Sequence, residues 1–380
     1  AAKALLTDID EITADGDSHV VIKLNAGNAD LPFVMSDYHL VMMPSDGEGN
    51  VDTDSGIGTG PYKLDEFEPG VRSEFTRNPN YFKEDRAHFD EVTMLILSDS
   101  TARNNALVTG EVDSISEAEA KTVRLLKRRK GLVVEEIPSG AHCTMPMHCD
   151  VAPFDNVDVR LALKYAINRE EMVEKILFGN GSIGNDSPIN AAYPLFQEAE
   201  QRTYDPDKAA FHFKESGHEG SVLLRTSDNS FPGAPDAAQL FQQSAQAAGI
   251  QLDIQREPSD GYWSEVWNKQ PFCTSYWSGR ATQDAMYSTA YLSSADWNDT
   301  RFFNEQFDQL LVAARGELDI AKRTSMYADM ATLVRDDGGL ICPMFNNFID
   351  ATSDKVAGWG PSKGFGLMNF YAPMKMWVTG

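Results

Sequence analysis

The segment PFDNVDVRLALKYAINREEMVEKILFGNG occupies residues 153–181 and has the periodicity of two consecutive helices. Leu161 and Tyr165 are four residues apart, as are Ala162 and Ala166. Residues at this spacing lie on one face of an α-helix, because the helix completes a turn every 3.6 residues. We therefore expect a first helix whose apolar face packs on a core.

A second helix is predicted directly after the first. Asn168 is a favourable N-cap residue, and Glu171 stands three positions later, where it can return the capping hydrogen bond. Gly179 follows Phe178 and is typical of a helix C-terminus. The pattern predicts a helical pair that ends in a glycine-rich turn.

Downstream, the pattern changes to strand, helix and strand. Residues 221–227 and 250–256 have the composition and alternation of strands, and 236–248 read as a helix that Gly249 ends. Two strands joined by a helix within about 35 residues predict a parallel βαβ unit. The expected fold class is α/β.

The chain before the helical pair contains further strand signals. Residues 18–25, 91–98 and 132–137 are predicted strands, and the Gly- and Asp-rich stretch 46–60 reads as a boundary loop. Near the C-terminus, Asp319 is placed to cap a long helix.

Composition restricts the class of protein. Of the 380 residues, 42% are hydrophobic and 10% aromatic, which is typical of a folded globular chain. No stretch approaches the ~18 consecutive apolar residues needed to cross a bilayer. The net charge of −24 argues against nucleic acid as a partner, because such binding requires clustered cations. The basic run at 121–130 is interpreted as one solvated helix face.

Neither the start of the chain nor its cysteines indicate a compartment. The first residues, AAKALLTDID, contain no initiator Met and no signal peptide, so we interpret them as an internal start. Cys143, Cys149, Cys273 and Cys342 are too scattered for a disulfide scaffold. In an extended segment Cys143 and Cys149 would lie ~20 Å apart, too far to bridge.

Enzyme motifs receive no support. The glycines of GNGSIG at 179–184 follow a helix, whereas a dinucleotide-binding loop follows a strand. GIGTG at 56–60 runs into Pro61, so no helix N-terminus is available for a phosphate. Both are interpreted as turns. With no G-x-S-x-G, H-E-x-x-H or C-x-x-C motif, we expect no catalytic residues and no cofactor.

One segment carries metal-ligand side chains. HCTMPMHC at 142–149 contains His, Cys and Met, which suit copper, nickel or zinc. In a strand, however, neighbouring side chains point to opposite faces. The favoured interpretation is a buried strand without a metal, and a metal site remains the alternative.

Aromatic side chains concentrate between residues 261 and 291. Apolar rings beside a few polar groups are what a small-molecule pocket needs, although ordinary core packing explains part of the set. The aromatic residues are Tyr262, Trp263, Trp267, Phe272, Tyr276, Trp277, Tyr287 and Tyr291.

Several segments resemble one family, the bacterial solute-binding proteins of the dipeptide, oligopeptide and nickel ABC importers, often called family 5. The similar segments run along nearly the whole chain. Besides 153–181, they are GTGPYKL at 58–64, RNPNYF at 77–82, STARNNALVTGEVD at 100–113, YDPDKAAFHFKESG at 204–217 and FDQLLVAARGELDIAKRTSMYADM at 307–330.

The resemblance implies a periplasmic-binding-protein type II fold with two lobes, a hinge and the remnant of a small extra domain. The expected boundaries are 1–56 for the remnant, 57–140 with 341–380 for lobe one, and 141–340 for lobe two. The hinge strands would be 140–149 and 341–348.

The resemblance also implies a function. We expect a monomeric periplasmic protein that captures a small solute, closes around it and delivers it to an inner-membrane ABC permease. Uptake of a metal or metal chelate is one alternative. A hydrolase or lyase acting on a carboxylated substrate is the other.

The ligand segment departs from the peptide-binding relatives. They place an Asp after Trp-x-Gly to bind the peptide's ammonium, whereas WSGRATQD at 277–284 has Arg280 there. A guanidinium takes a carboxylate or another anion instead, and Asp284 is the nearby acid left for an amine. The expected ligand-binding residues are Trp263, Tyr276, Trp277, Gly279, Arg280, Asp284 and Phe345.

Overall fold

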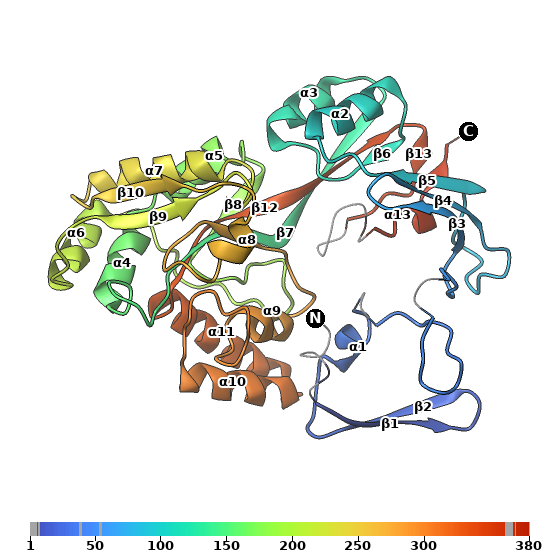
Figure 1. Cartoon of the computed structure of the whole chain (residues 1–380), viewed down its shortest axis with the longest axis horizontal. Helices are drawn as coiled ribbons and strands as arrows, with labels where there is room; N and C mark the ends of the chain where they lie inside the picture. Colours follow the sequence, from blue (N-terminus) through green and yellow to red (C-terminus); the bar gives the residue numbers. More distant parts are fainter. Residues whose placement is uncertain are drawn as a thin grey trace. The chain divides into compact units, whose positions relative to one another are not determined.

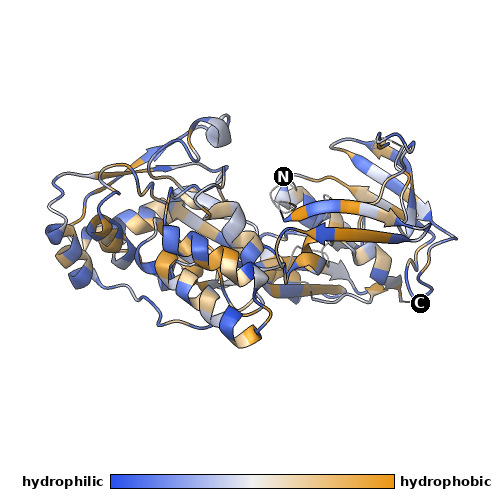
Figure 2. Cartoon of the chain, turned by 90° about the horizontal axis from the view of Figure 1, so that it is seen from below, coloured by the Kyte–Doolittle hydropathy of each residue, from blue (hydrophilic) through white to orange (hydrophobic). Residues whose placement is uncertain are grey.

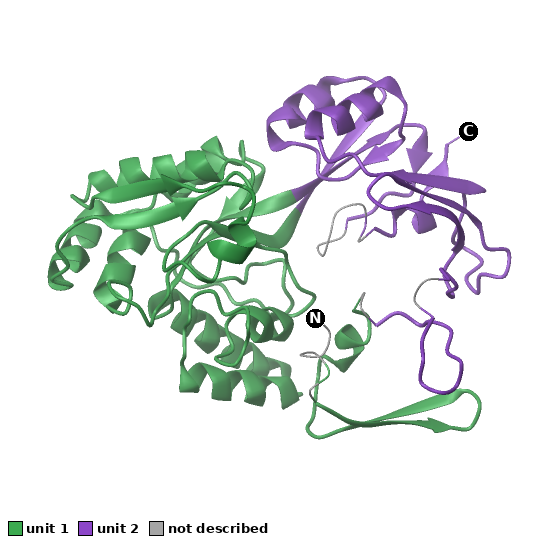
Figure 3. Ribbon diagram, viewed as in Figure 1, with its two compact units in different colours: residues 1–37, 138–347 green, residues 38–137, 348–380 purple. Residues whose placement is uncertain are grey.

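The computed structural model describes residues 6, 8–37, 40–52, 55–361, 368 and 370–379. The chain forms two compact units, with residues 1–37 and 138–347 in unit 1 and residues 38–137 and 348–380 in unit 2 (Figure 3). The predicted domain boundaries stay a prediction. Parts of the predicted segments 1–56 and 341–380 lie outside the described residues.

Unit 1 contains most of the helices (Figure 1). Its elements are β1 (Ile9–Asp15), β2 (His19–Leu24), α1 (Leu31–Val34), α4 (Val157–Tyr165), α5 (Arg169–Lys175), β8 (Gly181–Ile183), α6 (Pro206–Glu215), β9 (Val222–Thr226), α7 (Ala234–Gln246), β10 (Leu252–Arg256), α8 (Tyr262–Glu265), β11 (Ser275–Trp277), α9 (Gln283–Ala290), α10 (Glu305–Gly316) and α11 (Ile320–Asp336). Many of these helices carry hydrophobic and hydrophilic residues side by side (Figure 2), as helices with one buried face do.

Unit 2 is built on the antiparallel sheet of β3, β4 and β5 and a small helical cluster. Its elements are β3 (Tyr62–Glu68), β4 (Arg72–Arg77), β5 (Glu91–Leu95), α2 (Ser100–Thr109), β6 (Ser114–Ile115), η2 (Ala120–Thr122), α3 (Val123–Arg128), β13 (Val356–Ala357), α13 (Ala372–Lys375) and β14 (Trp377–Val378). Within the basic run, Val123 and Leu126 are buried while the cationic side chains of α3 remain largely exposed.

Two long strands contain the points at which the chain passes from one unit to the other. They are β7 (Leu132–Pro146) and β12 (Leu340–Ser353). Inside unit 1 their residues are almost all buried, among them Met145 and Met344 with no exposed surface. β11 pairs antiparallel with β7, and β7 is hydrogen-bonded to β12.

The predicted helical pair is confirmed, and so is the N-cap of its second helix. The side chain of Asn168 accepts a hydrogen bond from the backbone N–H of Glu171 at 3.1 Å. The second helix ends earlier than predicted, at Lys175 with Ile176 as its C-cap, and Gly179 lies in the turn that follows, with a φ of 79°. Short-range sequence signals therefore located both helices and the start of α5, but not its end.

The predicted βαβ unit is also confirmed. β9 and β10 pair in parallel, with Leu252 opposite Val222 and Arg256 opposite Thr226, and α7 connects them. Helix α7 buries Ala237, Ala238 and Phe241 in the core of unit 1. The α/β fold class follows from this arrangement.

The interpretation of residues 179–184 as a turn is wrong in part. Residues Gly181–Ile183 form β8, which pairs antiparallel with β12 through Ser182 opposite Phe345. The reason is steric, because a Cβ at Gly181 would lie 2.3 Å from the carbonyl oxygen of Phe345 and one at Gly184 would lie 2.0 Å from that of Cys342. The glycines allow a close strand contact rather than a free turn.

A buried ionic cluster joins α5 to the chain around it. Asp186 has no exposed surface, and its carboxylate accepts hydrogen bonds at 2.7 Å from Arg169 and from Arg202. Burial alone would raise the pKa of Asp186, but the two guanidinium groups hold it below its usual value. The carboxylate is thus ionised and compensates two buried cations.

Replacing this carboxylate tests the cluster. We expect Asp186→Asn to lower the free energy of unfolding by about 3–5 kcal/mol, because it leaves buried cations without an opposite charge. Urea denaturation followed by circular dichroism measures the loss. Asp228→Asn is the control, since Asp228 pairs with Arg256 at the exposed surface and should contribute within about 1 kcal/mol. Equal losses in the two variants would contradict the assignment.

Candidate functional site

The candidate site is held by the pairing of β11 with β7. In this antiparallel register Tyr276 lies opposite Cys143 and Trp277 lies opposite His142. Successive strand residues point to opposite faces, so Trp277 is buried at 5% exposure while Tyr276 is 47% exposed. The sheet therefore presents one ring of this pair to solvent and anchors the other in the core.

Gly279 fixes the path of the chain after β11. A Cβ at this position would lie 3.1 Å from the Cα and carbonyl carbon of Gly140 on β7. The two backbones approach so closely that a larger residue forces one of them to move. The position of the next residue, Arg280, is thereby tied to β7.

Arg280 is half-buried and is oriented by neutral groups. Its backbone N–H donates to the Tyr193 hydroxyl at 3.1 Å, and its Nη1 donates to the carbonyl oxygens of Ser278 at 3.0 Å and Gly279 at 3.3 Å. These contacts hold the side chain but supply no opposite charge.

Arg280 differs from the other arginines of unit 1. Among the described residues, each of the others forms an ion pair with a carboxylate, whereas Arg280 forms none. The paired arginines are Arg160, Arg169, Arg202, Arg225, Arg256, Arg301, Arg315, Arg323 and Arg335. A cation that stays unpaired in so acidic a unit is available to an anionic ligand.

The strand that precedes this arginine in the chain, β11, contributes two rings to a group that we call the aromatic wall. It consists of Trp263, Trp267, Tyr276, Trp277 and Trp297. The ring centroids of Trp263 lie 5.9 Å from Trp267 and 5.6 Å from Tyr276, and those of Trp297 lie 6.2 Å from Trp267 and 6.0 Å from Trp277. Trp263, Tyr276 and Trp297 are 36–47% exposed, so the wall offers apolar surface to a solute.

Asp299 lies behind the wall and was not predicted from the sequence. Its Oδ2 accepts hydrogen bonds from the indole N–H groups of Trp267 at 2.9 Å and Trp277 at 3.3 Å. The residue is 1% exposed, and burial raises the pKa of its carboxyl from 3.8 to about 7. One acid among 57 carries no local signal of this role, because its two partners are distant in sequence.

The two remaining predicted residues, Asp284 and Phe345, are buried and have contacts of their own. Asp284, on α9, is buried and accepts a hydrogen bond from Arg315 at 3.1 Å, and Arg315 also pairs with Asp8. Burial raises the pKa of Asp284, and Arg315 opposes that shift. Phe345 is 3% exposed and packs against the His142 ring, with centroids 5.2 Å apart.

The predicted buried strand covers the first part of the segment 142–149, because β7 ends at Pro146 and Met147 forms an isolated bridge, while His148 and Cys149 lie beyond the strand. His142 and Met147 have no exposed surface, and the His142 ring nitrogen Nδ1 lies 2.9 Å from the carbonyl oxygen of Gly140. Burial lowers the pKa of His142 to about 4. Within the described part of the chain, no group of three His, Cys, Asp or Glu residues is arranged to hold a metal ion, and the four cysteines are free.

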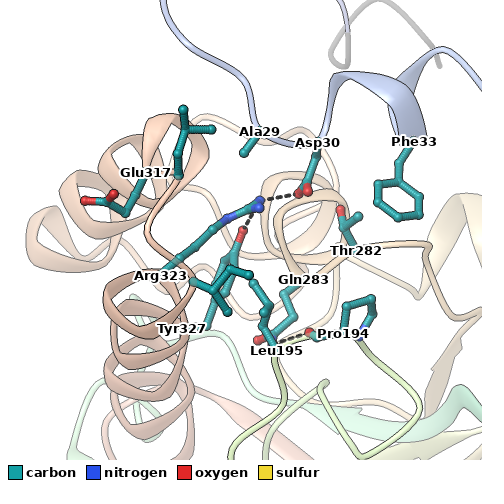
Figure 4. Close-up of a pocket in the computed structure, with 12 residues that line it drawn as sticks. Ala29, Asp30, Phe33, Pro194, Leu195, Thr282, Gln283, Glu317, Arg323 and Tyr327 are labelled. Carbon is teal, nitrogen blue, oxygen red and sulfur yellow. Dashed lines mark hydrogen bonds and ion pairs between the residues drawn. The ribbon is translucent and has the colours of Figure 1, made fainter.

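Thr282, two residues after Arg280, helps to line a cavity of about 330 Å³ (Figure 4). Apolar walls surround Arg323, which pairs with Asp30 at 2.6 Å and donates to the Tyr327 hydroxyl at 3.1 Å. The lining residues are Ala29, Asp30, Phe33, Pro194, Leu195, Thr282, Gln283, Glu317, Leu318, Ile320, Arg323 and Tyr327. Thr282 and Gln283 thus connect the cavity to the loop that carries Arg280.

Comparison with known proteins gives a consistent match. The family model described as "Bacterial extracellular solute-binding proteins, family 5 Middle" matches residues 1–299. The chain is 26% identical over 324 residues to the glutathione-binding protein GsiB of Salmonella choleraesuis (strain SC-B67), covering 81% of this chain and 63% of that protein. GsiB of Escherichia coli (strain K12) is 25% identical with the same coverage. The chain therefore spans less than two thirds of the length of these relatives.

Solved structures show the same fold. The dipeptide-binding protein of Pseudoalteromonas sp. SM9913, in complex with Met-Leu, superposes with a TM-score of 0.82 at 20% identity, covering all of this chain and 77% of that one. NikZ of Campylobacter jejuni, in complex with Ni(L-His), also has a TM-score of 0.82, at 19% identity, covering 97% of this chain and 79% of that one. The predicted periplasmic-binding-protein fold is confirmed. None of the helices in the described residues has the length and apolarity that crossing a membrane requires.

The buried carboxyl of Asp299 predicts a pH dependence of stability. Its folded-state pKa of about 7 exceeds the ordinary value of 3.8, so the folded protein binds this proton more tightly than the unfolded chain does. The resulting stabilisation is complete below about pH 4 and disappears as the pH rises through 7. In urea denaturation from pH 4 to 8, we expect wild type to lose stability relative to Asp299→Asn. A constant difference between the two proteins across this range would contradict the assignment.

Proposed function

The chain belongs to the bacterial extracellular solute-binding proteins of family 5, and from this premise we propose that it captures a small solute outside the cytoplasm for an ABC importer. In this proposal the protein is periplasmic, binds its ligand without chemical change and delivers it to an inner-membrane permease. The relatives named above are binding proteins rather than enzymes, which supports the proposal. Binding energy from the ligand would favour the closed state of the protein.

The proposed class of ligand is inferred from Arg280, whose guanidinium has no carboxylate partner among the described residues. A half-buried cation held by neutral groups, in the loop that follows a strand of the aromatic wall, fits a solute with a carboxylate and an apolar or planar part. Peptide-like acids have both features. Glutathione, which the GsiB relatives bind according to their names, carries two carboxylates and is the first solute to test.

The structure gives less support for binding of an amino group of the solute than for binding of its acidic group. Asp284 is the acid that the sequence offered for an ammonium group, but its carboxylate pairs with Arg315. Binding an amine there would require breaking a buried ion pair, which costs several kcal/mol (about 3–5). We therefore assign the orienting contact to the acidic group of the solute.

Uptake of a metal chelate is the second candidate. NikZ binds Ni(L-His), and the carboxylates of an amino-acid chelate would suit Arg280 as a peptide acid does. In this form the chelate is cargo, held through its organic ligand. A binding comparison between glutathione and Ni(L-His) separates the two candidates.

Calorimetry with the purified chain tests the proposed function. We expect glutathione to bind one per chain and to be recovered intact by mass spectrometry after overnight incubation. Binding of Ni(L-His) alone would transfer the assignment to chelate uptake. Conversion of the recovered solute to a product would instead support a hydrolase or lyase.

Substitution of Arg280 tests the residue that orients the solute. We expect Arg280→Ala to weaken binding of the solute by ~2–5 kcal/mol, the range for removing one partner of a buried charge pair, and Arg280→Asp to abolish binding. Because Arg280 has no carboxylate partner, the thermal midpoint should change little. Arg256→Ala is the matched control, since that arginine is 66% exposed and pairs with Asp228. Unchanged affinity in Arg280→Ala would overturn the role of Arg280.

A further inference from the structure

We propose that Asp299 is the positioning residue of the aromatic wall, holding its tryptophans in place for the solute and holding them more firmly when it is ionised. This inference rests on the proposed function, because it assigns the wall to solute binding. It adds a residue that touches no solute itself and acts through two indole rings.

The geometry makes Asp299 a shared anchor. One oxygen, Oδ2, accepts from Trp267, which follows α8, and from Trp277, the last residue of β11. Two segments that are separate in sequence are thereby joined at one atom. Indole N–H groups donate only, so both rings depend on this oxygen for their buried hydrogen bond.

The exposed rings of the wall rest on these two anchored rings. Trp297 contacts both Trp267 and Trp277, and Trp263 contacts Trp267. Tyr276 in turn packs against Trp263 at a centroid distance of 5.6 Å. Because interiors are closely packed, a shift of either anchored indole moves the surface that a solute would meet.

The protonation state of Asp299 changes the strength of both anchors. An ionised carboxylate accepts shorter and stronger hydrogen bonds than a neutral acid does. Its second oxygen, Oδ1, is buried and has no hydrogen-bond partner among the described residues, so it can take a proton without breaking either indole bond. The wall is therefore held in both states, and more tightly in the ionised one.

The groups around Asp299 leave it as the titrating residue near neutral pH. Burial raises the pKa values of Cys273 and Tyr291, so both are neutral there. Burial lowers the pKa of His148 to about 4, and the nearby Arg301 and Asp150 form an ion pair with each other at 3.6 Å. With its pKa raised to about 7, Asp299 is the one of these neighbouring groups whose charge is expected to change between pH 6 and 8. Burial also lowers the pKa of Lys164 to about 7, so the comparison with Asp299→Asn is what assigns a transition to Asp299.

The first test uses the tryptophans of the unliganded protein as reporters. We expect the near-ultraviolet circular dichroism and tryptophan emission of wild type to change between pH 6 and 8, and Asp299→Asn to lack this transition. Asp150→Asn is the control, because it removes a neighbouring acid that contacts no indole and should keep the transition. Persistence of the transition in Asp299→Asn, or its absence in wild type, would overturn the proposal.

The second test measures solute affinity with glutathione as the probe. Asp299→Leu should bind roughly tenfold or more weakly, because two buried indole N–H groups lose their acceptor. Asp299→Asn retains an acceptor oxygen and should recover most of the affinity. It should also remove the rise in affinity that wild type shows from pH 6 to 8. Equal affinity of wild type and a folded Asp299→Leu variant would contradict a positioning role.

The two tests separate this inference from the proposed function. If wild type fails to bind glutathione, the choice of solute is wrong, while the reporter experiment still decides whether Asp299 holds the wall. If glutathione binds but the tryptophan signal does not respond to Asp299→Asn, the function stands and the positioning role is lost.

Discussion

The close backbone contact between Gly279 and Gly140 is the constraint on which the candidate site depends. It exists because β11 pairs with β7 and because Gly279 has no side chain to separate the two backbones. The pairing buries Trp277 and exposes Tyr276, and the contact that follows sets the direction of Arg280. The contact thus sets where the chain carries Arg280 away from β11, while Asp299 joins the two anchored tryptophans of the wall.

The elements predicted correctly are those specified by neighbouring residues. Asn168 and Glu171 are three positions apart, so the cap that starts α5 could be recognised from sequence alone. β8 was missed because the strand it pairs with, β12, lies about 160 residues further along the chain. Gly181 and Gly184 are needed to let the carbonyl oxygens of β12 approach, and no neighbouring residue indicates this. The same distance in sequence explains why Asp299 was not identified, whereas comparison of a short motif was enough to single out Arg280.

Burial of an acid has different consequences in three places in unit 1. Asp186 forms ion pairs with two guanidinium groups and stays ionised, so it serves as a structural counter-charge. Asp284 meets Arg315, which offsets part of the effect of burial. Asp299 meets only neutral N–H donors, and its proton is therefore held to a higher pH. The partner, rather than burial alone, decides which acid can respond to pH.

The absence of an ion pair at Arg280 is informative because the chain has an excess of acidic residues. In a chain with 57 acids and 33 basic residues, a nearby carboxylate is available to most arginines, and every other arginine of unit 1 has one among the described residues. Arg280 instead donates to two carbonyl oxygens, which orient a guanidinium without neutralising it. In the proposed function, this uncompensated charge supplies the electrostatic preference for an anionic solute. The acidic surface would meanwhile repel anions that lack a second contact, so in this proposal apolar packing on the wall and the charge on Arg280 act together in selecting a solute.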